Sequence, residues 1–461
     1  MPVYLDHAAT TPMRPAARAA YVDALGVVGN PSSIHSQGQE AKRLLEESRE
    51  VVAGSLGAEP IEVIFTSGGT ESINLGIKGL WWKRQATDAT AVASGGRPVI
   101  LAPGGEHHAT VDAIEWLVRH EGASVVWLPI DGVGRLAPAV LEAALAEHGA
   151  SVALVTLLWA NNEVGTVQDV AALVAVARSH GVPVHVDAVA AYGYLPIEFA
   201  AVGADALSVS AHKIGGPVGI GALVLARRSE VEPLIHGGNQ QRVRSGTQDV
   251  AGAVAFAAAA AEVTRELGAA ASARAGQRPV VAGAVSAGDG AGGAGVAGLA
   301  DARAAVGSGL SAGAGGEGAA GFVASGSPFV DELAALRDRL IAGVQEAVPG
   351  AVLRGDPSPE GRLPGNVHFT FPGAQGDSLL FLLDMAGFSV STGSACQAGV
   401  PEVSHVLTAM GVPEPEALGA LRFTLGHGTT PAEVDALVAA LPAAYAAASR
   451  AGLSTRAPST P

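Results

Sequence analysis

Between residues 63 and 225, short apolar runs alternate with longer stretches whose apolar residues recur at helical spacing. The expected strands are 63–66, 99–102, 124–128, 152–159, 184–186, 206–210 and 220–225. The expected helices are 39–56, 71–83, 109–120, 138–148 and 170–180, the last with Asp169 as its N-cap. Strands that alternate with helices in this way form a mostly parallel sheet through right-handed crossovers. The sequence therefore predicts an α/β fold with its ligand site at the carboxyl ends of the strands.

The rest of the chain predicts a second unit and an insertion. Residues 269–328 consist mainly of Ala, Gly, Ser and Val without any periodicity, so they bury too little large apolar surface to offset chain entropy. Helical spacing returns at 330–348, and further strands and helices follow to about 447. We predict a large α/β domain at 15–262, and a smaller α/β domain made of 1–14 and 329–450. Residues 269–328 form a disordered insertion in this scheme, and 451–461 form a flexible tail.

Charge and cysteine content exclude several kinds of function. The net charge is -15 and no basic run is present, which disfavours direct nucleic-acid binding. The single cysteine, Cys396, rules out an internal disulfide and a Cys-rich metal site, and fits a reducing compartment. No apolar run reaches the ~18 residues of a membrane span, and the first residues lack the apolar core of a signal peptide. We therefore expect a cytoplasmic protein that does not bind membranes.

The run Thr66–Ser72 closes an expected strand and opens an expected helix. Free backbone amides and the helix dipole make such a junction a site for anions. Gly69 lets the backbone approach a phosphate closely, and Thr70 adds a hydroxyl donor. An ordinary capped turn is the alternative interpretation.

Asp187 and Lys213 lie one helix and one strand apart, at the same predicted edge of the sheet. Asp187 ends a buried apolar strand, so it needs a partner, either a cationic ring nitrogen or a helix N-terminus. Lys213, close to Ser210 and His212, is either a surface lysine or an amine that forms a Schiff base with an aldehyde. Together with the anion site, this pair fits the logic of pyridoxal 5'-phosphate (PLP) binding.

Three further residues have two interpretations each. His107, between a strand and a helix, either stacks on a cofactor ring and moves protons or faces solvent. Cys396 lies among small and polar residues and is either a reactive loop thiolate or inert. Arg422, inside an apolar strand, needs an anionic partner, which is either a substrate carboxylate or an internal acid.

Eight runs occur in order along the chain: YLDHAATTP (4–12), GNPSS (29–33), SGGTES (67–72), NNEVG (161–165), HVDA (185–188), SAHK (210–213), RSGT (244–247) and GSAC (393–396). Together they resemble cysteine desulfurases of the NifS/IscS type, which are fold-type-I PLP enzymes of the class V aminotransferase family. The resemblance spans the chain except 269–328 and 85–97. It implies a large domain with a mostly parallel sheet, a smaller α/β domain and an obligate homodimer.

The resemblance also implies site residues. Lys213 is then the Schiff-base lysine, Asp187 the partner of the pyridine nitrogen, and His107 the residue stacked over the ring. The remaining cofactor ligands are Gly69, Thr70, Ser210 and His212 at the phosphate, Thr247 reaching it from the other subunit, and Asn162 at a cofactor oxygen. Arg422 and Asn30 bind substrate, with Arg422 on its carboxylate. Cys396 is the nucleophile that becomes a persulfide.

The implied reaction removes sulfur from L-cysteine, releases L-alanine and passes the persulfide to an iron–sulfur cluster scaffold or a tRNA-thiolation enzyme. No resident metal is expected, although the Cys396 persulfide could contact a transient iron–sulfur cluster. One departure concerns Ala190, where the family usually has a Gln that donates to the ring oxygen. The alternatives are a selenocysteine lyase or aminotransferase on the same scaffold, or a catalytically weak sulfur carrier or scaffold subunit.

Overall fold

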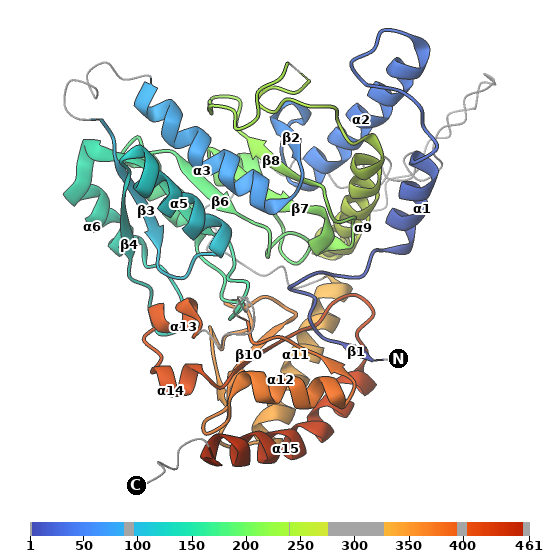
Figure 1. The fold of residues 1–461 in the computed structure, drawn as a ribbon. Helices are drawn as coiled ribbons and strands as arrows, with labels where there is room; N and C mark the ends of the chain where they lie inside the picture. Colours follow the sequence, from blue (N-terminus) through green and yellow to red (C-terminus); the bar gives the residue numbers. More distant parts are fainter. Residues whose placement is uncertain (1, 87–95, 239, 275–326, 394–402, 455–461) are drawn as a thin grey trace.

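The computed structural model describes residues 2–86, 96–238, 240–274, 327–393 and 403–454. Figure 1 shows two units, one above the other. The upper unit contains a large sheet with helices on both of its faces, and the lower unit contains the C-terminal elements together with the N-terminal strand β1 (Val3–Tyr4). The predicted α/β architecture is therefore confirmed.

The central sheet of the upper unit has seven strands in the described part of the chain, in the order β2-β8-β7-β6-β5-β3-β4. Strand β8 runs antiparallel to both of its neighbours, and the other pairs are parallel. Every residue of β5, β6, β7 and β8 is buried, which explains their continuous apolar sequences. The strands are β2 (Val63–Thr66), β3 (Val99–Pro103), β4 (Ser124–Leu128), β5 (Val152–Leu158), β6 (Val184–Asp187), β7 (Ala206–Ser210) and β8 (Gly221–Leu225).

Helices cover both faces of this sheet and enclose two hydrophobic cores. One face carries α3 (Gly69–Ala86) and α5 (His108–Glu121), which lie in front of the sheet in Figure 1. The other carries α1 (Pro15–Ala24), α2 (Ser36–Ser55), α6 (Pro138–His148), α7 (Val170–Ser179) and α9 (Val250–Arg274). Asp169 caps α7 as predicted, because its side chain accepts a hydrogen bond from the Ala172 amide. Short elements are α8 (Phe199–Val202), η1 (Pro60–Glu62), η2 (Gly149–Ser151) and η3 (Ala211–Ile214).

The lower unit is built on a small antiparallel sheet with the order β12-β10-β9. Phe369, Phe371 and Phe423 are fully buried in its core. Strand β1 pairs in parallel with β11, which joins the first residues of the chain to this unit. The elements are β9 (Val352–Leu353), β10 (Asn366–Thr370), β11 (Phe388–Ser389), β12 (Ala420–Thr424), α11 (Pro328–Ala347), α12 (Gly376–Met385), α13 (His405–Ala409), α14 (Glu414–Ala417) and α15 (Pro431–Ser454).

Three helices extend into segments that the sequence predicts as the insertion or the tail, namely α9, α15 and α11, which begins at Pro328. Helix α9 continues to Arg274, six residues into the predicted insertion, because its last turns are rich in alanine, the strongest helix former. Helix α15 continues to Ser454, so the first residues of the predicted tail are helical as well. The remaining parts of these predictions, 275–326 and 455–461, lie outside the described residues. No described helix combines the length and apolar character needed to cross a membrane.

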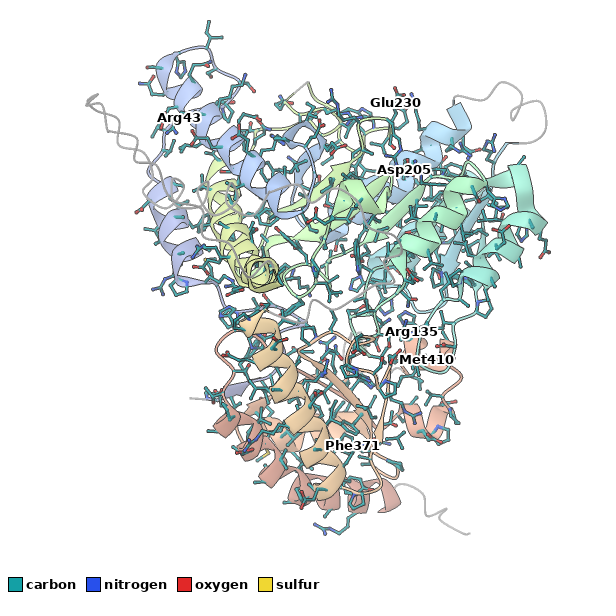
Figure 2. All side chains as sticks on the ribbon, turned by 180° about the vertical axis from the view of Figure 1, so that it is seen from behind. Arg43, Arg135, Asp205, Glu230, Phe371 and Met410 are labelled. Atoms are coloured by element: carbon teal, nitrogen blue, oxygen red, sulfur yellow. The ribbon has the colours of Figure 1, made fainter. Side chains whose placement is uncertain are left out.

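The two units contact each other through polar and apolar groups. Arg135 of the upper unit forms an ion pair of 2.6 Å with Asp356 of the lower unit. Val164 packs in one cluster with Met410. Figure 2 labels Arg135 and Met410, both at the level where the units meet. These contacts hold the two units against each other.

Candidate active site

A cavity of about 370 Å³ opens at the carboxyl ends of β5, β6 and β7, between the two units. Its volume is in the range of small-molecule and cofactor sites. The upper unit contributes Gly69, Thr70, His107, Asn162, Asp187, Ser210, His212 and Lys213 to its lining, and the lower unit contributes Arg422. The structure therefore gathers nine of the predicted site residues around one cavity, at the sheet edge that the sequence predicts.

The junction of β2 and α3 forms one end of this cavity and has free donors. Ser210 Oγ is buried there without a hydrogen-bond partner among the described residues, and Thr70 is exposed. A Cβ atom added to Gly69 would lie 2.8 Å from Val189 Cγ2, so any larger residue would have to displace that side chain. An unsatisfied buried hydroxyl beside the N-terminus of a long helix is suited to an anion such as a phosphate group.

Asp187 and Lys213 stand at the ends of the neighbouring strands β6 and β7. Burial raises the pKa of Asp187 to about 6, an effect that the hydrogen bond from the Val189 amide and the nearby Lys213 charge oppose. Burial and the Arg422 charge lower the pKa of Lys213 to about 8, against the effects of Asp187 and Asp6. A buried carboxylate with one backbone donor can still bind a cationic ring nitrogen, which would restore its ionised form.

His107 lines the same cavity as the N-cap residue of α5. Its Nδ1 accepts a hydrogen bond of 3.0 Å from the Ala109 amide, so the neutral ring carries its proton on Nε2. Burial lowers the pKa of His107 to about 4, and Lys213 and the neighbouring histidines act in the same direction. The ring is therefore uncharged at neutral pH.

Glu106 is a buried acid next to His107. Its Oε1 accepts a hydrogen bond of 2.9 Å from the Leu158 amide, whereas Oε2 has no partner among the described residues. Burial raises the pKa of Glu106 to about 8, and the charge of Asp187 acts in the same direction. Glu106 is therefore largely protonated at neutral pH.

We expect Glu106→Gln to make protein stability less dependent on pH. The folded pKa of Glu106 lies above the unfolded value, so its contribution to stability is fully present below about pH 4.5 and is lost as the pH rises toward 8. Because Gln cannot ionise, the stability of the variant relative to the wild type should increase as the pH rises, by roughly a few kcal/mol at most. Melting temperatures of both proteins at pH 5 and pH 8 measure this effect. An equal change in melting temperature between the two pH values for both proteins would contradict it.

Arg422 has the internal acid partner that one interpretation of the sequence predicts, and its role toward a substrate carboxylate stays a prediction. It faces the cavity, and it also forms internal bonds, from Nη1 to the Asn162 carbonyl (3.0 Å) and from Nη2 to Asp6 Oδ1 (2.8 Å). Its Nε is buried without a partner among the described residues. The guanidinium thus keeps donor capacity for an incoming carboxylate.

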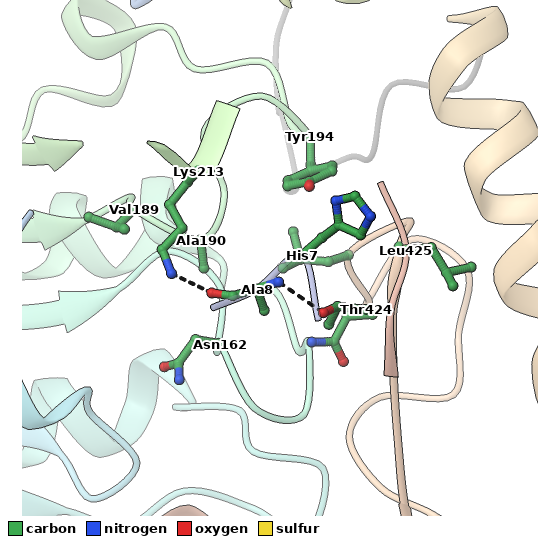
Figure 3. Close-up of a pocket in the computed structure, with 12 residues that line it drawn as sticks. His7, Ala8, Asn162, Val189, Ala190, Tyr194, Lys213, Thr424 and Leu425 are labelled. Atoms are coloured by element: carbon green, nitrogen blue, oxygen red, sulfur yellow. Dashed lines mark hydrogen bonds between the residues drawn. The ribbon is translucent and has the colours of Figure 1, made fainter. Parts of the chain in front are cut away.

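Lys213 contacts the first residues of the chain. Its Nζ donates to the carbonyl oxygens of Ala8 and Ala9, the latter at 3.0 Å. Figure 3 shows the hydrogen bond from Lys213 to Ala8. Both residues line a smaller cavity of about 30 Å³, which Ala190 also lines. Ala190 lines both cavities, so the position at which the resemblance predicts a Gln faces the site. The methyl side chain of Ala190 supplies no hydrogen-bond donor there.

Two predicted site residues do not line this cavity, and a third lies outside the described residues. Thr247 and Asn30 are exposed and do not line it. The Asn30 side chain accepts a hydrogen bond from the Ser32 amide in its own turn. Cys396 lies outside the described residues, and the neighbouring Gly393 lines the cavity.

Sequence reasoning missed two residues that contact the site. Asp6 binds Arg422, which is 416 positions away, and Glu106 binds the amide of Leu158, which is 52 positions away. No local spacing predicts contacts over such separations. The signals that were present are indirect: Asp6 belongs to the YLDHAATTP run, and Glu106 directly precedes His107.

Comparisons with known proteins agree with this geometry. The model of the family Aminotransferase class-V matches residues 3–280. The "IscS-like cysteine desulfurase" of Mycobacterium tuberculosis (strain ATCC 25618 / H37Rv) is 44% identical, over 98% of both chains. Among solved structures, a "NIFS-LIKE PROTEIN" is 28% identical with a TM-score of 0.73, over 96% of this chain and 99% of that one. "SspA in complex with cysteine" is 27% identical with a TM-score of 0.65, over 92% and 98%. The chain therefore belongs to the class V aminotransferase family and, within it, to the cysteine desulfurases.

Proposed function

We propose that this protein uses PLP to remove sulfur from free L-cysteine, releasing L-alanine and leaving a persulfide on Cys396. The observation that carries the proposal is one cavity that joins a buried carboxylate, a lysine and a candidate anion site on one side to an arginine on the other. The carboxylate, the lysine and the anion site would bind the ring nitrogen, the aldehyde and the phosphate of PLP, and the arginine would bind the carboxylate of an amino acid.

The residues proposed to hold PLP surround the anion site and the sheet edge. Gly69, Thr70, Ser210 and His212 would bind its phosphate, and Thr247 would reach the same phosphate from a second subunit. Asp187 would pair with the ring nitrogen, Asn162 would bind a cofactor oxygen, and His107 would stack on the ring. When bound, PLP supplies a conjugated system that accepts the electrons released at the substrate α-carbon.

The chain's own residues then divide the remaining work. Arg422 would bind the substrate carboxylate, and Asn30 is a further substrate residue implied by the family. The Lys213 amine would take the proton from the α-carbon and return one later; its pKa of about 8 leaves a useful neutral fraction near neutral pH. The Cys396 thiolate would attack the substrate sulfur, and the carbon–sulfur bonding electrons would stay with carbon, which is protonated to the alanine methyl group.

The proposed partners follow from the same assignment. The exposure of Thr247, away from the cavity of its own chain, supports a homodimer in which each subunit completes the other's site. The persulfide would pass to an iron–sulfur cluster scaffold or a tRNA-thiolation enzyme. The similarity to the solved structure of SspA in complex with cysteine supports cysteine as the substrate class. A cytoplasmic location remains a prediction.

Product analysis tests the proposed function. Purified protein supplied with PLP, L-cysteine and a thiol reductant should release alanine and sulfide in equal amounts. Formation of a keto acid instead would indicate an aminotransferase, and a strong preference for selenocysteine would indicate a selenocysteine lyase. A colourless protein that binds no PLP and forms neither product would indicate a sulfur carrier or scaffold subunit.

A further inference from the structure

The segment Asp6–Thr10 contacts three of the predicted site residues, although it takes no part in the chemistry proposed above. Asp6 binds Arg422, the carbonyls of Ala8 and Ala9 accept from Lys213, and Thr10 Oγ1 lies 3.2 Å from His212 Nδ1. Ala8 and Ala9 also line the main cavity. The segment thus forms part of the cavity wall and links the substrate arginine to the lysine.

The backbone around Asp6 is fixed in place. Asp6 forms a β-bridge with Thr424, next to Arg422 on β12. The amides of His7 and Ala8 donate to the carbonyl and the Oγ1 of Thr424, at 3.3 Å and 2.8 Å. Figure 3 shows the bond from Ala8 to Thr424. The carboxylate of Asp6 is therefore presented to Arg422 from a rigid main chain.

Arg422 is held at two points that define the plane of its guanidinium group. Its Nη2 bonds to Asp6 and its Nη1 bonds to the Asn162 carbonyl, which comes from the other unit. The arginine side chain is 6% exposed, against 21% for Asp6, so solvent competes little for these bonds. Without Asp6, one of the two fixed points is lost, and a long side chain with several rotatable bonds regains other orientations.

We propose that Asp6 is a positioning residue that orients Arg422 to receive the carboxylate of the amino-acid substrate. The assignment rests on the proposed function, because it requires Arg422 to bind that carboxylate. Asp6 does not touch the substrate in this scheme. Substitution of Asp6 should therefore weaken the binding only of ligands that carry a carboxylate. A general loss of structure would weaken the binding of all ligands, so the two explanations can be told apart.

The experiment compares two ligands on the PLP-loaded protein, L-alanine with a carboxylate and cysteamine without one. Titration of the visible absorbance gives a dissociation constant for each without requiring turnover. Asp6→Ala should raise the dissociation constant of L-alanine about tenfold, because a hydrogen bond to a charged group is lost. The dissociation constant of cysteamine should stay within about twofold of the wild-type value. KM for L-cysteine should rise in the same proportion, with kcat nearly unchanged. Asp23→Ala, at an exposed position on α1, is the matched control and should change neither constant.

Asp6→Asn keeps an acceptor at the same place and should recover part of the affinity for L-alanine. Asp6→Asn also tests the proposal if Asp6→Ala does not fold, because a selective decrease in the affinity for L-alanine is still expected. Equal weakening of both ligands, or unchanged binding of L-alanine, would overturn the proposal. Tighter binding of L-alanine would overturn it too, since Asp6 would then compete with substrate for Arg422. If Asp6→Ala selectively weakened the binding of L-alanine but the wild type formed no sulfide, the proposed function would be refuted and the role of Asp6 toward Arg422 would stand.

Discussion

Lys213→Ala should abolish the visible absorbance that bound PLP gives the protein and lower alanine production by about a thousandfold or more. Lys213 is the only lysine among the residues that line the main cavity, within the part of the chain that the structure describes. It lies in η3, three residues after the end of β7 and close to Ser210 at the candidate anion site, so a cofactor held there by its phosphate would have its aldehyde near this amine. Among the described lining residues, no other side chain offers a primary amine for that bond or for proton transfer at the α-carbon.

Two variants make this result specific. Lys42→Ala removes an exposed lysine from α2 and should leave both the absorbance and the activity unchanged. Lys213→Arg keeps a positive charge, but guanidinium stays protonated and cannot replace the amine, so it should be as inactive as the alanine variant. If Lys213→Ala retained the visible band of the wild type, another amine would hold the cofactor, and the assignment of Lys213 as the Schiff-base lysine would be wrong.

The sequence predicts those parts of the site that depend on local order. An apolar run followed by an acid predicts that Asp187 ends a buried strand, and the rule for parallel sheets then brings Asp187 and Lys213 to one edge. The anion site follows from glycines between a strand and a helix. Each of these inferences uses only the order of residues in a short segment, and the structure gathers the corresponding side chains around one cavity.

Other parts of the site depend on contacts that local order does not encode. The sequence leaves Arg422 with two alternative anionic partners, and in the structure it bonds to Asp6 while still facing the cavity. That bond requires the N-terminal segment to lie beside β12, which only the tertiary fold decides. Thr247 and Asn30 do not line the cavity of their own chain, and their roles stay predictions.

Cys396→Ser should stop sulfide release while leaving the visible PLP band intact. The serine hydroxyl is far less acidic and less nucleophilic than a thiol, so it should not attack the substrate sulfur. Lys213, Asp187 and the anion site remain, so cofactor binding should not change. We therefore expect a coloured protein whose alanine and sulfide production falls by about a thousandfold or more.

The cysteine content of this chain makes the test unusually direct. Cys396 is the only cysteine in the 461 residues, so any protein-bound persulfide must be on it. After incubation with L-cysteine, the mass of the wild type should rise by one sulfur atom, and a thiol reductant should reverse the change. The serine variant should show no such increase, and prior alkylation of the wild type should reproduce the inactivity of the variant. Sulfide release by Cys396→Ser at the wild-type rate would mean that sulfur leaves cysteine without passing through the protein's own thiol.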